Sequence, residues 1–244
     1  MHKTPPKSLN DICSEWDGVC EKRQIAIEQG QDVSLSLVTA PCIVKNVREA
    51  APNAILDVGC GTGYVTSLLA QEAAICCGID ASQHSIDLAK DRYSLPNLQF
   101  FHSKLSEFSS CTQFDLCVSN MVLNCSPDLR GDLRGIYKLL PSGGIFLAMI
   151  PHPCFWPLYW GFQNEPWFHY QEEMFIEHDF SISLVKAMGK STYIHRPLSQ
   201  YIQEIVSIGF SLKGIEEPYP VGPVPRGYSY SYPRFLFLKC RKDI

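Results

Sequence analysis

The sequence lacks several features that would assign it to a specialised class of protein. No apolar run reaches the ~18 residues that a membrane helix needs. The first ten residues, MHKTPPKSLN, contain no apolar core of a secretory signal. The 11 cysteines are odd in number and include no CxxC pair. We therefore expect no membrane partner, a cytoplasmic location, no bound metal, and free thiols that are mostly buried.

An excess of basic residues is also missing. The chain has 21 Lys and Arg against 25 Asp and Glu, which gives a formal net charge of -4. This balance predicts no nucleic-acid partner. Hydrophobic residues make up 45% of the 244 residues, enough for a packed core in one domain. The oligomeric state is left open by these observations.

The N-terminal part has the pattern of helices. Residues 1–8 are expected to form a frayed tail. Apolar residues at spacings of three and four predict a helix from Leu9 to about Glu28. A second helix is expected from Asp32 to Ala50, ended or kinked at Pro41.

From Ala54 onward, short buried strands alternate with helices, which is typical of βαβ units and a mostly parallel sheet. The expected strands are 54–59, 74–80, 98–102, 114–120 and 144–150, and the expected helices are 62–73, 82–93 and 128–140. A helix at 197–210 and strands at 210–218 and 235–240 should close the sheet with an antiparallel hairpin. The segment 151–196 breaks this rhythm and is dense in aromatic residues.

One domain of four parts is therefore predicted: an N-terminal helical lid (1–50), a ligand-binding core (51–150), an aromatic cap (151–196), and a closing helix and strands (197–244). The fold class is α/β, with a doubly wound, seven-stranded, mostly parallel sheet, an antiparallel C-terminal strand, and a helical and aromatic cap.

The main chemical motif is Asp57-Val58-Gly59-Cys60-Gly61-Thr62-Gly63. A strand ends at the acid, and glycines then open a helix whose free N–H groups can meet a ligand. The next strand ends in Asp80, where a carboxylate can accept hydrogen bonds from both hydroxyls of a ribose.

This D-x-G-x-G-x-G motif resembles motif I of the class I S-adenosylmethionine-dependent methyltransferases, in the small-molecule (type 11-like) branch. It differs from the G-x-G-x-x-G of nicotinamide enzymes. Further segments resemble the same family: the N-terminal stretch 9–17, GIDAS (78–82), FDLCVSNMVL (114–123), LLPSGG (139–144) and the late helix 195–210. The resemblance implies a Rossmann-like methyltransferase fold with S-adenosylmethionine as cofactor and S-adenosylhomocysteine as product.

The resemblance also implies roles for residues. Asp57 would orient the loop and meet the amino group of the cofactor, Asp80 would hold the ribose, and Asn120 would face the amino-acid part or the substrate. The family's acid after strand three is replaced by Ser103-Lys104-Leu105. The expected cofactor-binding residues are Asp57, Gly59, Cys60, Gly61, Gly63, Asp80, Ala81, Lys104, Leu105, Asn120 and Trp16.

Methyl transfer requires alignment, and it requires a base only when the acceptor must lose a proton. His152, which follows the fifth strand between two prolines, is the first candidate base, and His195 is the second. Each has an alternative role as a structural histidine. The aromatic segment is expected to wall a planar or apolar acceptor. The expected substrate-binding residues are Met121, Asn124, Trp156, Tyr159, Trp160 and Tyr193.

The leading hypothesis is a methyltransferase acting on an oxygen or nitrogen of a small molecule, such as a secondary metabolite. A nucleic-acid or protein methyltransferase is an alternative, but the residues Ser119-Asn120-Met121-Val122 stand where base-methylating enzymes carry a [DNS]-P-P-[YFW] box. A catalytically silent partner subunit that binds the cofactor is a third. Some relatives methylate arsenic through thiols, but the cysteines have no metal-like spacing.

Overall fold

The computed structural model describes residues 1–243 and is built around a seven-stranded sheet. Its order is β4-β3-β2-β5-β6-β10-β9, with the first five strands parallel and the last two antiparallel to their neighbours. The strands are β2 (Ala54–Val58), β3 (Ile75–Asp80), β4 (Leu98–His102), β5 (Leu116–Asn120), β6 (Ile145–Pro151), β9 (Phe210–Glu216) and β10 (Phe235–Lys242). The predicted fold class, including the antiparallel closing strand, is confirmed.

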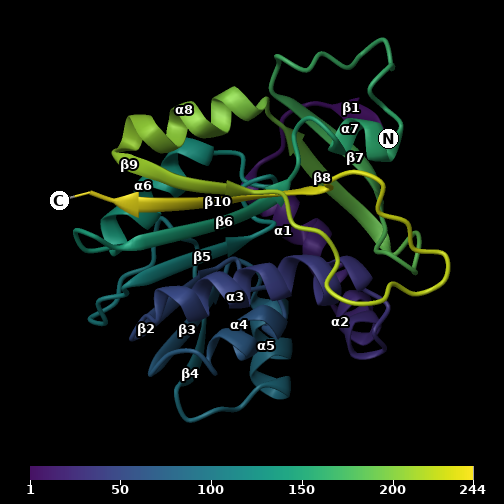
Figure 1. The fold of residues 1–244 in the computed structure, drawn as a ribbon. Coiled ribbons are helices and arrows are strands. Elements are labelled where there is room, and N and C mark those ends of the chain that lie inside the picture. The colour runs from purple at the N-terminus through teal and green to yellow at the C-terminus, as the bar shows by residue number, and fades with distance from the viewer. Residues whose placement is uncertain (244) are drawn as a thin grey trace.

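Helices cover both faces of this sheet (Figure 1). The helices α3 (Ala40–Ala50) and α4 (Tyr64–Leu69) pack on one face, and α6 (Leu129–Leu139) and α8 (Leu198–Ile208) pack on the other. The helix α5 (Gln83–Arg92) lies against β3 and β4, and its N-cap, Ser82, accepts a hydrogen bond from the Ser85 amide.

Alternation along the central strand explains why it is buried on both sides. In β2 all five residues are buried. Leu56 and Val58 join the core beneath α6 and α8, whereas Ile55 joins the core beneath α3 and α4. A central parallel strand of this kind reads as a continuous apolar run, which is why the sequence predicts it well.

A second, three-stranded sheet, which the sequence did not predict, joins the cap to the N-terminal segment. Its order is β1-β7-β8, all antiparallel, from β1 (His2–Thr4), β7 (Met174–Phe180) and β8 (Gly189–His195). Only the short helix α7 (Trp156–Trp160) gives the cap its helical part. The expectation of a frayed tail at residues 1–8 is wrong, because residues 2–4 pair with the edge of β7.

The N-terminal helices differ in detail from the predicted ones. The helix expected from Leu9 to Glu28 is two helices, α1 (Leu9–Asp17) and α2 (Cys20–Glu28), which are separated at Gly18 and Val19. The second expected helix begins with a π-helical turn, η1 (Leu35–Thr39), which runs directly into α3. Pro41 lies in the first turn of α3, immediately after the π-helical turn, and the Leu37 carbonyl four residues before it accepts a hydrogen bond from the Val221 amide at 2.8 Å instead.

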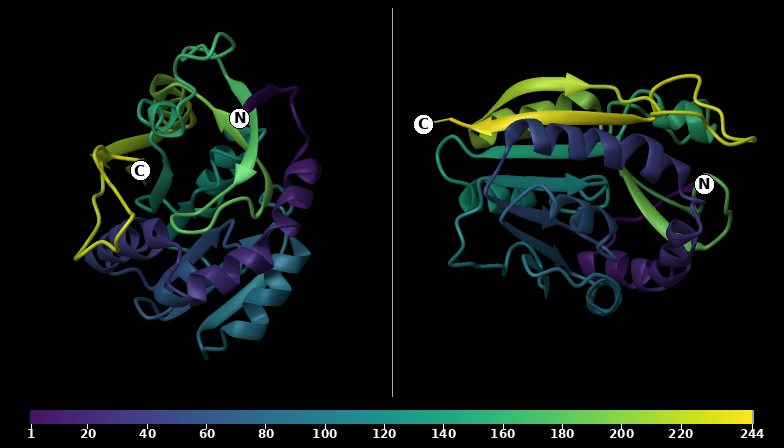
Figure 2. Two further views of the ribbon diagram at one scale, coloured as in Figure 1. Left: turned by 90° about the vertical axis from the view of Figure 1, so that its right-hand side faces the viewer. Right: turned by 60° about the horizontal axis from the view of Figure 1, so that its bottom comes forward.

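The small sheet and the N-terminal helices lie over the end of the large sheet where the parallel strands finish (Figures 1 and 2). Ligands bind at this end in open α/β sheets. Within residues 1–243, none of the helices has the length and hydropathy needed to cross a bilayer.

Candidate functional site

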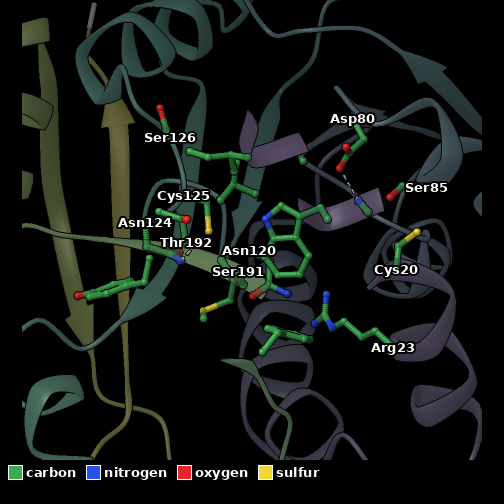
Figure 3. A pocket seen from close by; sticks show the side chains of 18 of the residues that line it. Cys20, Arg23, Asp80, Ser85, Asn120, Asn124, Cys125, Ser126, Ser191 and Thr192 are labelled. Carbon is green, nitrogen blue, oxygen red and sulfur yellow. Dashed lines mark hydrogen bonds between the residues drawn. The ribbon is translucent and has the colours of Figure 1, made fainter. Parts of the chain in front are cut away.

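A cavity of about 270 Å³ opens at the carboxyl ends of the parallel strands. Its walls come from α1 and α2, the glycine loop after β2, the ends of β3 and β5, the small sheet, and the start of β10. Figure 3 looks into this cavity, with Asp80 and Asn124 on opposite sides and Asn120 between them.

The glycine loop, residues 59–63, forms one wall of the cavity, and its three glycines have different surroundings. At Gly61, which has a φ of +53°, an added Cβ would meet no atom within 4 Å, so its backbone lies open to the cavity. At Gly59 a Cβ would lie 2.3 Å from a methyl of Val122, and at Gly63 it would lie 2.7 Å from the ring of Phe100. Gly61 therefore permits close approach of a ligand, while Gly63 is required by packing.

Asp80, at the end of β3, lines the cavity and holds the loop in place. Its Oδ2 accepts a hydrogen bond from the Gly61 amide and its Oδ1 accepts one from the Ser82 amide, both at 2.8 Å. Burial raises the pKa of Asp80, although the two amides oppose that rise. Each carboxylate oxygen keeps a second lone pair, so Asp80 can still accept two hydroxyl groups from a ligand.

Two amide side chains, one at the end of β5 and one shortly after it, have carbonyl oxygens that accept no hydrogen bond from residues 1–243. The Oδ1 atoms of Asn120 and Asn124 are buried and have no partner among residues 1–243, and both residues line the cavity. Buried carbonyl oxygens without a donor are costly. This part of the cavity is therefore suited to a ligand that carries N–H or ammonium groups.

Three expected cofactor-binding residues, Asp57, Cys60 and Gly63, are not among the cavity-lining residues. Asp57 is 1% exposed, and its Oδ2 accepts a hydrogen bond from the Thr66 hydroxyl at 2.7 Å. Burial raises the pKa of Asp57 to about 7. In this structure Asp57 ties β2 to α4 through Oδ2, and its Oδ1 is buried without a partner among residues 1–243, so the contact with a ligand amino group stays a prediction. The Sγ of Cys60 packs beneath Gly78.

The other expected cofactor-binding residues do line the cavity: Trp16, Gly59, Gly61, Asp80, Ala81, Lys104, Leu105 and Asn120. Trp16 comes from α1 and packs edge-to-face on Phe180 of β7, with ring centroids 5.0 Å apart. The N-terminal helices and the small sheet therefore meet at the roof of the cavity.

All six expected substrate-binding residues line the same cavity: Met121, Asn124, Trp156, Tyr159, Trp160 and Tyr193. Trp156 packs against Tyr159, Trp160 and Tyr193, with centroid distances from 5.6 to 6.2 Å. We call these four rings, Trp156, Tyr159, Trp160 and Tyr193, the aromatic wall.

Neither of the two expected catalytic histidines, His152 and His195, lines the cavity. Both ring nitrogens of His152 contact other groups of the protein. His152 Nε2 lies 2.8 Å from Glu217 Oε1, and its Nδ1 accepts a hydrogen bond from the Cys154 amide at 3.2 Å. His195 Nε2 donates to the Tyr170 carbonyl at 3.0 Å, and its ring packs edge-to-face on Phe168. Both nitrogens of His152 are thus engaged by the protein, and His195 Nδ1 lies 3.5 Å from the Tyr193 hydroxyl, so in this structure both histidines occupy structural positions outside the cavity.

A different histidine, His178 of β7, lines the cavity beside Trp160. Its Nδ1 donates to the Asp179 carbonyl at 3.2 Å, which fixes the tautomer and leaves the Nε2 lone pair without a protein donor among residues 1–243. Burial lowers the pKa of His178, so the imidazole is neutral at pH 7. Sequence analysis missed this residue because the strand that carries it was not predicted.

Two arginines also line the cavity and were missed. Arg23 of α2 lies 3.5 Å from Asp32. Arg234, which precedes β10, is 6% exposed and has no carboxylate partner among residues 1–243. Neither stands in a motif, so the sequence offered no indication of their place.

Cysteines contribute Cys13, Cys20 and Cys125 to the cavity wall. Burial raises the pKa of Cys13 to about 11 and that of Cys125 to about 12. These thiols are therefore protonated at neutral pH. Among the described residues, no group of three His, Cys, Asp or Glu is arranged to hold a metal ion.

The core of the chain, which carries the glycine loop, matches a known protein family. The family described as "Methyltransferase domain" matches residues 56–148, which run from β2 to β6 and include the glycine loop, Asp80 and Asn120. Residues 56–148 therefore carry a methyltransferase domain of the class I S-adenosylmethionine-dependent type. The predicted resemblance is thus confirmed.

Curated relatives match this methyltransferase domain over part of their length. The malonyl-[acyl-carrier protein] O-methyltransferase of Acetivibrio thermocellus is 32% identical over 113 residues, which cover 45% of this chain and 40% of that protein. The trans-aconitate 2-methyltransferase of Deinococcus radiodurans is 35% identical over 99 residues, 40% of this chain and 37% of that protein. The arsenite methyltransferase of Mus musculus is 29% identical over 44% of this chain and 31% of that protein. The chain thus spans about two fifths or less of these relatives.

Solved structures share the fold over most of the chain. A methyltransferase from Listeria monocytogenes gives a TM-score of 0.67 at 20% identity and covers 84% of this chain and 98% of its own. The protein DhpI, in a complex with SAM and HEP, gives 0.67 at 18% identity and covers 98% and 100%. The likeness therefore extends beyond the methyltransferase domain to the cap.

Proposed function

We propose that this protein is a methyltransferase that transfers the methyl group of S-adenosylmethionine to an oxygen or nitrogen of a small molecule. The observation that carries the proposal is that one cavity joins the glycine loop and Asp80 to the aromatic wall. A cofactor site and an acceptor site in a single cavity are what direct group transfer needs, because both reactants must be aligned.

The residues of the cavity fit the cofactor. The open backbone at Gly61 gives room for close approach, and Asp80 has lone pairs for the two ribose hydroxyls. The unpartnered Oδ1 atoms of Asn120 and Asn124 suit the ammonium group of the methionine part. When bound, S-adenosylmethionine supplies an electrophilic methyl group on a sulfonium.

The protein contributes alignment, exclusion of water and a proton acceptor. Trp16 and Phe180 close the roof, and the aromatic wall presents a flat apolar surface for the acceptor. We place the proton acceptor at His178 Nε2, because the other ring nitrogen is held by the Asp179 carbonyl and the imidazole is neutral.

The relatives do not fix the acceptor, since their names specify malonyl-acyl carrier protein, trans-aconitate and arsenite. Arsenite would require thiolates, and burial raises the pKa of both Cys13 and Cys125 far above neutrality. A small organic acceptor therefore fits the cavity better than arsenite does.

The test is calorimetry followed by a turnover assay. S-adenosylhomocysteine should bind with one site per chain, and NAD should not bind appreciably. Incubation with S-adenosylmethionine and pools of small aromatic hydroxy, amino and carboxylic compounds should then release S-adenosylhomocysteine in an acceptor-dependent way. Binding of NAD in place of S-adenosylhomocysteine would overturn the proposal. Cofactor binding without turnover on any pool would instead support the silent partner subunit.

A further inference from the structure

Arg234 stands at the acceptor end of the cavity. It directly precedes β10, and its carbonyl oxygen accepts a hydrogen bond from the His152 amide at 2.8 Å, beside the carboxyl end of β6. Its side chain is 6% exposed and lines the cavity. The guanidinium lies over the ring of Tyr159, 4.0 Å from its centroid, and so adjoins the aromatic wall.

The charge of Arg234 is not balanced by an acid of the protein. Its Nη2 donates to the Ser229 carbonyl, and its guanidinium lies 4.8 Å from the ring centroid of Tyr228 and 5.1 Å from that of Tyr230. Burial raises the pKa of Tyr228, and raises that of Tyr230 to about 12, so both phenols are neutral. No carboxylate oxygen among residues 1–243 lies within 4.0 Å of the guanidinium. Buried cations are ordinarily paired.

The acids of the cavity already have other partners. Asp32 faces Arg23 at 3.5 Å and accepts a hydrogen bond from the Leu35 amide. Asp80 accepts from the backbone of the glycine loop. The third acid, Asp132, lies in the first turn of α6 and makes no ion pair with Arg234. Arg234 is therefore a buried cation whose charge an anionic ligand could neutralise.

The sheet separates this cation from the expected ribose site. Asp80 ends β3, and Arg234 precedes β10, which is four places further along the order β3-β2-β5-β6-β10. At a spacing of about 4.8 Å per strand, the two ends are roughly 19 Å apart. The glycine loop and Asn120, at the ends of β2 and β5, lie between them. Arg234 thus belongs to the acceptor side.

We propose that Arg234 is the anion-binding subsite for the methyl acceptor, and that the acceptor is a small organic acid. Its carboxylate would pair with the free N–H groups of the guanidinium, while its apolar or aromatic body packs on Tyr159 and Trp156. This inference rests on the proposed function, because it assigns the acceptor for the same cavity.

The test compares acids with their uncharged amides on protein saturated with S-adenosylhomocysteine. The probes are benzoate and benzamide, phenylacetate and phenylacetamide, and indole-3-acetate and indole-3-acetamide, measured by calorimetry. At least one acid should bind tenfold or more tightly than its amide. The variant Arg234→Met should reduce the affinity for that acid roughly tenfold to hundredfold and leave the amide within about twofold.

Arg226→Met is the matched control, since it removes the same charge from an exposed position in the neighbouring loop. It should leave acid binding unchanged. Arg234→Lys keeps the charge and loses the planar fork, so it should retain part of the preference for the acid; it also serves if the methionine variant does not fold.

Two results would overturn the assignment. One is the absence of an acid-selective affinity across all three pairs. The other is a folded Arg234 variant whose melting temperature falls while its preference for the acid is kept. Arg234 would then serve only to pack against the rings of Tyr159, Tyr228 and Tyr230. Failure of the proposed function looks different, because S-adenosylhomocysteine itself would then fail to bind to the unaltered protein.

Discussion

The two sides of the cavity are built in different ways. The cofactor side comes from consecutive segments, the glycine loop after β2 and Asp80 at the end of β3, and it uses backbone amides as much as side chains. The acceptor side is assembled from α7, β7, β8 and the start of β10, which are far apart in the sequence. The first side is specified by a local motif, and the second is specified by tertiary packing.

The largest expected effect tests the acceptor side. We expect His178→Gln to lower the methyl-transfer rate by about 10²–10⁴, because the neutral Nε2 would no longer accept the proton. Since burial lowers the pKa of His178 below its usual 6.5, the rate of the unaltered protein should be flat above about pH 6.5 and fall at lower pH. The rate is measured as S-adenosylhomocysteine released per minute across a pH series.

The control for this variant is His169→Gln, at an exposed position of the cap, which should leave the rate unchanged. A loss smaller than fivefold in the His178 variant, with an unaltered pH profile, would show that alignment alone drives the transfer.

Asp57 gives the next effect, on stability rather than on rate. Its pKa is raised to about 7 in the folded protein, well above the ~3.9 of an unfolded chain, so the folded state holds a proton that the unfolded state releases. Its contribution to stability is therefore present below about pH 4 and is lost as the pH rises to 7. Asp57→Asn should remove this loss.

Urea unfolding at pH 4.5 and pH 8 measures that difference. Relative to the unaltered protein, the Asp57→Asn variant should gain on the order of a few kcal/mol between the two pH values, at about 1.4 kcal/mol per pKa unit. The exposed exchange Asp87→Asn is the control and should show no such gain. Equal pH dependence in all three proteins would contradict a protonated Asp57.

Asp80 tests the cofactor side. We expect Asp80→Ala to weaken binding of S-adenosylhomocysteine by roughly 1.5–3 kcal/mol, the scale of a lost charged hydrogen bond. Calorimetry at pH 7 measures it, with Asp87→Asn again as the control. If the affinity did not change, the ribose would have to bind elsewhere in the cavity.

The smallest expected effect concerns His152. Its two ring nitrogens already contact Glu217 and the Cys154 amide, so His152→Gln should change the rate less than fivefold, while lowering the melting temperature. A loss of 10²-fold or more, without a loss of stability, would bring His152 back as the catalytic base.

The large sheet could be predicted from the sequence, whereas the small sheet could not. The parallel strands were predicted to within about two residues, because buried strands between glycine and helix signals are local features. The hairpin β7–β8 was missed because both of its faces are partly buried. One face packs Met174 and Ile176 against Tyr193, and the other packs Phe175 and Ile194 against α1, so no alternation of polar and apolar residues remains.

The cavity residues divide in the same way. Gly59, Gly61, Asp80 and Asn120 could be placed because each lies at the end of a predicted strand or just after it. His178 and Arg234 could not, since a single histidine or arginine gains its meaning only from the segments packed around it. His152 shows the reverse case, in which a position at the end of a strand predicted a cavity residue and the side chain instead pairs with Glu217.

The pairing of β1 with β7 has a consequence for the order in which the protein matures. His2 lies opposite Glu177, so β1 has no partner until β7 has been made. The loop and acid of the cofactor side are complete by Asp80, whereas the acceptor side waits for Arg234. A nascent chain would therefore be able to form the sheet around the glycine loop first, and the acceptor chamber would close last, once Arg234 and β10 have joined the large sheet.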